Sequence, residues 1–488
     1  MELAIATLLI ATGFLLGISW VRKRRLCLAF LTILTSGLPI FAGPDEALAA
    51  ALLDVRELPA PLAKRTRYLD LSVYTPSERM LLLSAFKGHT AELSREAFYL
   101  PPRVLAGGML LAVVLDWYQW DTHTWEQLGN DPYYYEWYKD AHNHYIHKPG
   151  DWLDKSVYQE LYQRTGSYAP VVSADWWFFY TSRNLDLNNK TISYGYYGFL
   201  GLKRRADFEA LGGTDKRVAS KLGLELLGAV RMGKSRISQL DRGVEWYRTL
   251  TGAYYLTLDT DSIANGNLLP AKLNRGAFKH KAEEGYITLP NGLWAFWLGD
   301  DKGEPQNTAP DFIGGNDSPL RRGRDTRIHI CQSCKDCHVN GGLQAVDDWA
   351  RQNFSLPGEL ETADYKRFQE LYRQYFGDLD KQVEKDRLAN REALLRLTGL
   401  TTEAYAERSA RIYYGYLSED WTLTRLARRM GVTEARLEQA LRNYAKKYQG
   451  FDDYLAPLSE LVSVPPGGLP VGYVEQLYPA LMKIVRHY

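Results

Sequence analysis

The sequence predicts an α+β fold, in which a mixed N-terminal region ends in a β-hairpin and the C-terminal domain is all helical. Short apolar and aromatic runs flank the turn Pro290-Asn291-Gly292, as in a hairpin. After Leu356-Pro357-Gly358 the chain has long charged segments with apolar residues every three or four positions, which is typical of amphipathic helices. These patterns divide the chain into a leader (1–49), an α+β region (50–300), a loop segment (301–356) and a helical domain (357–488).

The elements of the N-terminal region follow from local patterns. Residues 67–86 start with a short alternating run and continue as a helix, because Thr75-Pro76-Ser77-Glu78 has the composition of a capping box. We then expect a helix at 91–97, a strand at 103–116, a helix at 152–164 and a buried aromatic segment at 168–180. The hairpin pairs 286–289 with 293–298, and a long polar loop (303–327) follows it.

The C-terminal domain should contain helices at 364–375 and 379–397. Residues 423–441 have the outline of a helix-turn-helix with Gly431 at the turn. A tight helical hairpin gives the same pattern, and the formal net charge is only +1 with both signs mixed along the chain. We therefore predict a structural hairpin and no nucleic-acid partner.

One motif indicates a bound cofactor. Cys334-Lys335-Asp336-Cys337-His338 is a C-x-x-C-H box, the spacing that holds c-type haem through two thioethers and the following imidazole. The two sulfurs must reach the same macrocycle from one turn of chain, and the histidine must follow at once to meet the iron. The sequence therefore predicts one covalently attached haem c, with Cys334, Cys337 and His338 as its attachment residues.

Cys331 lies upstream and makes a second, overlapping C-x-x-C with Cys334. Cys331, Cys334, Cys337 and His338 could instead form a Cys3His zinc site. We favour haem, because structural zinc sites usually draw ligands from two separated pairs and the only other cysteine is Cys27. A redox pair or disulfide between Cys331 and Cys334 is a further alternative.

The N-terminus predicts export, which covalent haem attachment requires. An apolar run (2–20) precedes the basic segment 21–25, and a second apolar run (26–42) follows it. From Val21 onward this resembles a complete secretory signal, with small residues at 42, 47 and 49 for cleavage, so the true start is expected at Val21. The alternative is a membrane anchor made of both apolar runs. Both interpretations place the remainder of the chain in the periplasm or otherwise outside the cytoplasm.

Several segments together resemble a family of uncharacterised, exported c-type cytochrome-like proteins of planctomycetes and related environmental bacteria. They are RYLDLSVY, YAPVVSADWWFFYTSR, FKHKAEEGYITLPNGLWAFWLGDDKGEPQNTAP, the C-x-x-C-H box and WTLTRLARRMGVTEARLEQALR. The resemblance implies periplasmic haem attachment and says little about function. The chain departs from the family at Cys331 and in a histidine-rich insert at 140–152.

The sixth iron ligand separates an electron carrier from a catalytic or gas-binding site. We predict His280, which directly precedes the hairpin and has a counterpart in the family. Met430 and Met482 are the downstream methionines, and Met430 is interpreted as structural. His329 is too close to the box to reach the opposite face of a haem.

Two further groups have ligand chemistry. His142, His144 and His147 form H-x-H-x-x-H and could hold zinc or copper, although we favour an exposed loop. Arg231, Lys234, Arg236 and Arg242 could neutralise haem propionates, although a solvated basic face is simpler. No catalytic residue can be named. The expected function is electron transfer with a periplasmic redox partner. The alternatives are a haem enzyme or gas sensor with an open sixth position, and a zinc-stapled structural or interaction protein.

Overall fold

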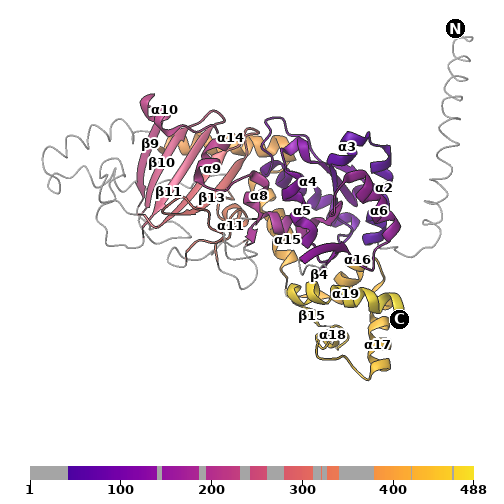
Figure 1. The fold of residues 1–488 in the computed structure, drawn as a ribbon. Coiled ribbons are helices and arrows are strands. Elements are labelled where there is room, and N and C mark those ends of the chain that lie inside the picture. Colours follow the sequence, from indigo (N-terminus) through magenta and orange to yellow (C-terminus); the bar gives the residue numbers. More distant parts are fainter. Residues whose placement is uncertain are drawn as a thin grey trace, which may run out of the picture.

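The computed structural model describes residues 42–139, 145–185, 194–230, 242–260, 280–310, 320, 327–339, 379–418, 420–463 and 467–488. The fold is mixed α+β with several separate sheets, and its C-terminal part is mostly helical. A five-stranded sheet lies at one end of the molecule, an α/β body lies in the middle, and the last helices lie at the other end (Figure 1). Residues 1–41, the predicted domain boundary at 356–358 and the predicted helix at 364–375 fall outside the described residues. The last residues of the predicted leader are described and belong to the folded protein, because α2 begins at Pro44 and its Ala47 and Leu48 are buried in the core.

The central body is built on a four-stranded sheet of order β2-β3-β1-β6. Its main elements are α2 (Pro44–Glu57), α3 (Ala60–Arg65), β1 (Thr66–Asp70), α4 (Pro76–Glu92), β2 (Arg103–Leu105), β3 (Leu110–Val114), α6 (Lys155–Thr165), β6 (Val171–Ser173) and α7 (Ala174–Thr181). The predicted start of α4 is confirmed, because Thr75 Oγ1 accepts from the Glu78 amide and the Glu78 carboxylate accepts from the Thr75 amide.

Two local predictions in this body need correction. Residues 91–97 form no separate helix, because α4 continues through Glu92 and ends at Leu93. Residues 103–116 form two strands instead of one, because a short turn at Ala106–Gly108 separates β2 from β3. Gly107 and Gly108 have φ of 63° and 88°, a backbone conformation that glycine adopts without strain.

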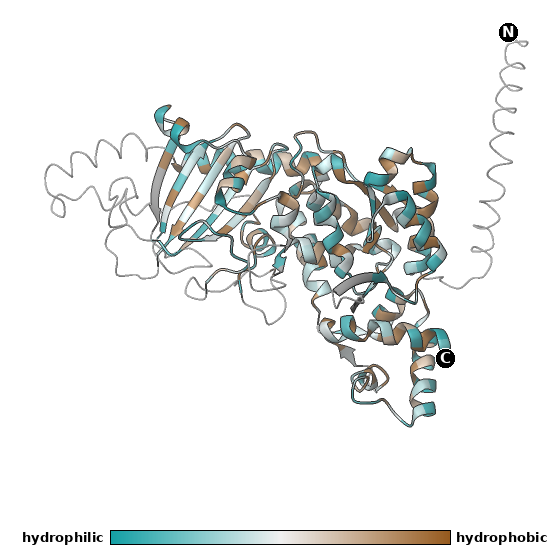
Figure 2. Cartoon of the chain, in the orientation of Figure 1, coloured by the Kyte–Doolittle hydropathy of each residue, from teal (hydrophilic) through white to brown (hydrophobic). Residues whose placement is uncertain are grey.

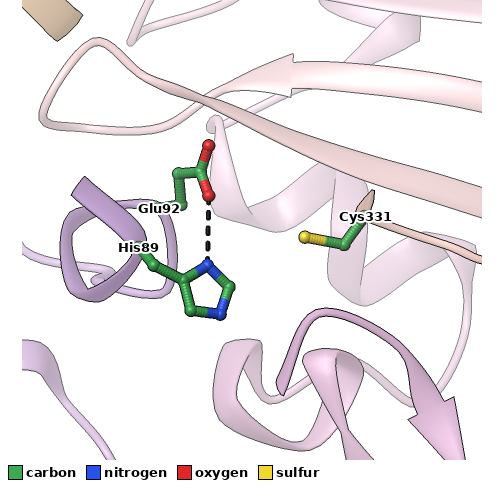
Figure 3. Close-up of side chains that lie close together, drawn as sticks. All are labelled: His89, Glu92 and Cys331. Carbon is green, nitrogen blue, oxygen red and sulfur yellow. Dashed lines mark hydrogen bonds and ion pairs between the residues drawn. The ribbon is translucent and has the colours of Figure 1, made fainter. Parts of the chain in front are cut away.

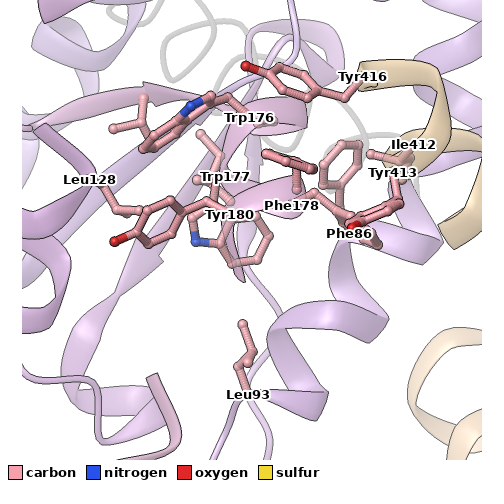
Figure 4. Packing of buried hydrophobic residues seen from close by; sticks show 14 of the residues in the cluster. Phe86, Leu93, Leu128, Trp176, Trp177, Phe178, Tyr180, Ile412, Tyr413 and Tyr416 are labelled. Atoms are coloured by element: carbon pink, nitrogen blue, oxygen red, sulfur yellow. The ribbon is translucent and has the colours of Figure 1, made fainter. Parts of the chain in front are cut away.

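The predicted buried aromatic segment is confirmed from Ala169 on, because residues 169–180 are buried and every residue of α7 is among the buried ones, whereas Tyr168 is exposed. Figure 4 shows its tryptophan, phenylalanine and tyrosine side chains packed against Phe86 of α4 and against Tyr413 and Tyr416 of α15 (Thr402–Tyr416). These rings come from distant parts of the chain, so α7 lies at the centre of the core.

The second sheet is entirely antiparallel, with the order β13-β12-β11-β10-β9. Its strands are β9 (Glu225–Val230), β10 (Arg242–Arg248), β11 (Ala253–Asp259), β12 (Ala282–Thr288) and β13 (Trp294–Asp300). The predicted hairpin is β12–β13, with longer strands than expected. Figure 2 shows both hydrophilic and hydrophobic residues along these strands, and β11 is buried along its whole length, as expected for a strand in the middle of a sheet that is covered on both faces.

Helices cover both faces of this sheet. On one face, Phe208 of α9 (Arg205–Leu211) packs against Trp297 and Tyr254. On the other, Asp386 of α14 (Leu379–Thr398) accepts hydrogen bonds from the sheet residues Trp246 and Tyr255.

The edge strand β13 has its free backbone groups satisfied by side chains. The amides of Phe296 and Leu298 donate to the hydroxyls of Tyr196 and Tyr197, which belong to α8 (Tyr196–Leu200). The two tyrosines therefore join the sheet to the central body and protect an exposed edge.

The C-terminal helices after α14 and α15 are α16 (Leu423–Met430), α17 (Glu434–Tyr448), α18 (Leu458–Leu461) and α19 (Val471–His487). The predicted hairpin is confirmed: α16 and α17 meet at Gly431, whose φ is 71°. These helices share one hydrophobic core with the N-terminal region, and Arg429 of α16 forms a buried ion pair with Asp175 of α7. The described part of 357–488 is thus packed into the remainder of the protein.

Within the residues that the structure describes, no helix is both long enough and apolar enough to cross a membrane.

Candidate functional site

The C-x-x-C-H box forms a short helix, α11 (Gln332–Cys337), which ends at His338. This helix packs against α15. His338, at its end, lies beside Phe296 of β13, which is the edge strand of the five-stranded sheet. At 100° per residue, Cys334, Cys337 and His338 share one side of such a turn, and Lys335 and Asp336 take the other. No disulfide bond joins Cys334, Cys337 or Cys331.

The two intervening residues anchor the box in the protein interior. Lys335 and Asp336 are both buried. The Lys335 ammonium lies 3.2 Å from the Glu92 carboxylate. Asp336 accepts a hydrogen bond of 2.5 Å from the Tyr414 hydroxyl and one of 2.8 Å from Gln332. Both contacts with α4 and α15 hold α11 at a fixed orientation.

The three motif residues with haem chemistry are on the less buried side. Cys334, Cys337 and His338 are each partly exposed, and the ring of His338 lies 6.1 Å from the ring centroids of both Tyr286 and Phe296. Two thiols and one imidazole therefore lie on the same side of one turn, the arrangement that a c-type haem box has. Of the two thiols Cys334 packs against the core, and burial raises the pKa of its thiol well above the usual value.

Cys331 is more deeply buried than Cys334, Cys337 and His338. It is 1% exposed, and burial raises the pKa of its thiol to about 12. Its sulfur faces His89 and Glu92 of α4 (Figure 3). Among the described residues, the group that gathers metal-ligand atoms is His89, Glu92 and Cys331. The alternative zinc set is therefore not brought together, although all four of its members lie in the described chain.

The donor chemistry of the box fits haem c, whereas the cavity beside it is too small for one. A cavity of about 40 Å³ lies between His338, Phe296, Lys335 and Tyr405. That volume admits about one water molecule, and pockets for ligands of cofactor size measure roughly 300–1,000 Å³. This cavity therefore could not enclose a haem, and a haem attached to the box would lie outside it.

His280 lies beside Glu283 in this arrangement. Its Nε2 lies 3.0 Å from a carboxylate oxygen of Glu283, and Glu283 is on the opposite face of β12 from Tyr286 because side chains alternate along a strand. His280 also precedes Tyr286 by six positions, roughly 20 Å at about 3.3 Å per residue. The role of His280 as sixth ligand therefore stays a prediction.

The other predicted ligands are placed as follows. Met430 and Met482 are buried, with 5% and 4% exposure, in the packing of α16 and α19. His329 pairs with Thr308 through a β-bridge, and Arg242 is already paired with Asp259 and Glu284. His142, His144, Arg231, Lys234 and Arg236 lie outside the described residues, and His147 is in β5 (Tyr145–Pro149), opposite Trp137 of β4 (Tyr135–Lys139).

Sequence reasoning missed the two residues behind the box, His89 and Glu92. They are three positions apart on α4 and therefore share a helix face. Two polar side chains on a helix face that packs into the core were the available signal. Only the folded chain shows that this face meets Lys335 and Cys331.

Comparisons of the chain with protein-family models, with curated proteins and with solved structures found no match.

Proposed function

We propose that the protein is an exported monohaem c-type cytochrome that transfers electrons to or from a periplasmic partner. Cys334 and Cys337 would form the thioethers, and His338 would bind the iron. The supporting observation is the division of α11, in which the two intervening residues are buried and paired while the three attachment residues share the accessible side.

A bound haem would supply one-electron transfer at this position. The protein itself would hold the haem-binding helix α11 in a fixed position. The Lys335–Glu92 ion pair and the Tyr414–Asp336 hydrogen bond fix the helix, and the rings of Tyr286 and Phe296 flank His338. A ligand helix held in this way needs little rearrangement when the charge on the iron changes.

The test is covalent attachment in three matched cysteine variants, produced with a c-type haem maturation system. Cys334→Ala and Cys337→Ala should each lose the normal two-thioether pyridine haemochrome spectrum, whereas Cys331→Ala should keep it. Haem staining on a denaturing gel checks that the link is covalent. A wild-type protein that carries zinc and no haem, or a requirement for Cys331 with Cys337 dispensable, would overturn the proposal.

A second candidate function is a haem enzyme or gas sensor with an open sixth position. It is favoured by the placement of the downstream methionines, because Met430 and Met482 are buried in the packing of α16 and α19. A high-spin ferric spectrum and rapid CO binding in the ferrous form would support it. In that case His280→Ala leaves the spectrum unchanged, whereas a six-coordinate low-spin wild type that becomes high-spin in His280→Ala supports the carrier.

A further inference from the structure

The buried cluster behind the box brings polar side chains of α4, α7 and α11 together in the protein interior. The His89 ring lies at its centre: Nε2 is 2.8 Å from the Thr181 hydroxyl and 3.3 Å from the Ser182 hydroxyl, and Nδ1 is 3.2 Å from the Glu92 carboxylate. The Thr181 hydroxyl also lies 2.7 Å from the Trp177 carbonyl.

These side chains are cut off from solvent, because His89, Glu92, Lys335 and Cys331 are all buried. A buried carboxylate needs a cation or a hydrogen-bond donor beside it.

In the structure the Lys335 ammonium takes that role, 3.2 Å from Glu92 and 3.5 Å from His89 Nδ1. Cys331 completes the cluster, since the ligand atoms of His89, Glu92 and Cys331 all lie within 4.8 Å of one another. These three are a nitrogen, an oxygen and a sulfur ligand, a set that suits Zn²⁺. Tetrahedral zinc bonds of about 2.0–2.3 Å place ligand atoms roughly 3.3–3.7 Å apart, so closure by about an ångström is enough.

An adjacent cavity can receive the Lys335 side chain when a metal ion displaces it. Lys335 also lines the 40 Å³ cavity beside His338, together with Asn390, Thr402 and Tyr405. The hydroxyl of Thr402 is buried, and within the described chain it meets no hydrogen-bond partner. The cavity has room for an ammonium and polar groups to receive it.

We propose that His89, Glu92 and Cys331 form a binding site for Zn²⁺ or a similar thiophilic divalent cation, which Lys335 occupies in the metal-free protein. On binding, the Cys331 S–H bond breaks, its proton goes to solvent, and a sulfur–metal bond forms, while Lys335 swings into the cavity. The thiolate and the Glu92 carboxylate balance the two charges of the metal. This site lies on the side of α11 opposite Cys334, Cys337 and His338. A bound metal would replace the Lys335–Glu92 ion pair as the link between α4 and the box, because Cys331 and Glu92 would then share one ion.

The test is equilibrium dialysis of the full-length protein against zinc, followed by metal analysis and repeated with Cd²⁺ for its thiolate charge-transfer absorption. We expect one zinc per chain in the wild type. Cys331→Ser should weaken binding at least tenfold and abolish the Cd²⁺ band, whereas the matched control Cys337→Ser keeps both. Lys335→Met should bind zinc more tightly than the wild type, because the competing cation is gone.

The gain in Lys335→Met cannot come from misfolding, so it tests the site independently of variants that lose binding. Absence of zinc from the wild type, equal loss in Cys331→Ser and Cys337→Ser, or weaker binding by Lys335→Met would overturn the proposal. Zinc bound by Cys331 in a protein that carries no haem would support this site and contradict only the proposed cytochrome function.

Discussion

Removal of the Arg429 charge should destabilise the whole protein, because Arg429 ties the C-terminal helices to the centre of the core. Its side chain is 1% exposed and pairs with Asp175, which is fully buried. The guanidinium carbon also lies 4.2 Å from the centroid of the Tyr133 ring. Arg429→Met keeps the volume and leaves the Asp175 carboxylate buried, with Arg425 at 4.0 Å as its nearest remaining cation.

Breaking a buried pair by removing one partner costs roughly 3–5 kcal/mol. We expect the free energy of unfolding of Arg429→Met to fall by about that amount. The double variant Arg429→Met with Asp175→Asn should recover much of the loss, because no uncompensated charge remains. The control is Arg442→Met, which removes an exposed i,i+4 pair with Glu438 and should cost less than about 0.5 kcal/mol.

The assay is urea unfolding followed by both far-UV circular dichroism and tryptophan fluorescence. One cooperative transition with coincident probes is expected, because the C-terminal helices share the core. A loss below about 1 kcal/mol in Arg429→Met, or an early separate transition of the C-terminal helices in the wild type, would refute the reasoning.

Two further predictions concern stability. Burial raises the pKa of Asp131 from 3.8 to about 7, so the folded chain holds this proton more tightly and the wild type should lose stability as pH rises from about 4 to about 7. In Asp131→Asn the fall in the free energy of unfolding with pH should be smaller by up to about 1.4 kcal/mol per pH unit. Urea titrations of both proteins across this pH range test this, and equal pH dependence in the two would contradict a raised pKa of Asp131. Asp386→Ala leaves the buried donors of Trp246 and Tyr255 unsatisfied and should cost about 2–5 kcal/mol, whereas the exposed control Glu384→Ala should stay within about 0.5 kcal/mol. Equal unfolding midpoints for these last two variants would show that Asp386 does not hold α14 to the sheet.

Several parts of the fold follow from sequence because they depend on neighbouring residues. The capping box at Thr75 and Glu78 places the start of α4, the Pro-Asn-Gly turn places the β12–β13 hairpin, and Gly431 places the turn between α16 and α17. Each signal acts over a few residues through hydrogen bonds or backbone freedom. The haem chemistry proposed for Cys334, Cys337 and His338 likewise rests on spacing alone.

The pairings across the chain were decided only by tertiary structure. The sequence placed His280 next to the hairpin, and only the folded chain shows that its imidazole lies 3.0 Å from the Glu283 carboxylate. Nothing in the spacing of Cys331 shows that it is buried against His89 and Glu92, more than two hundred residues away in sequence. Such contacts depend on which faces of distant elements pack together, and a periodic pattern shows that a face is buried without showing what it is buried against.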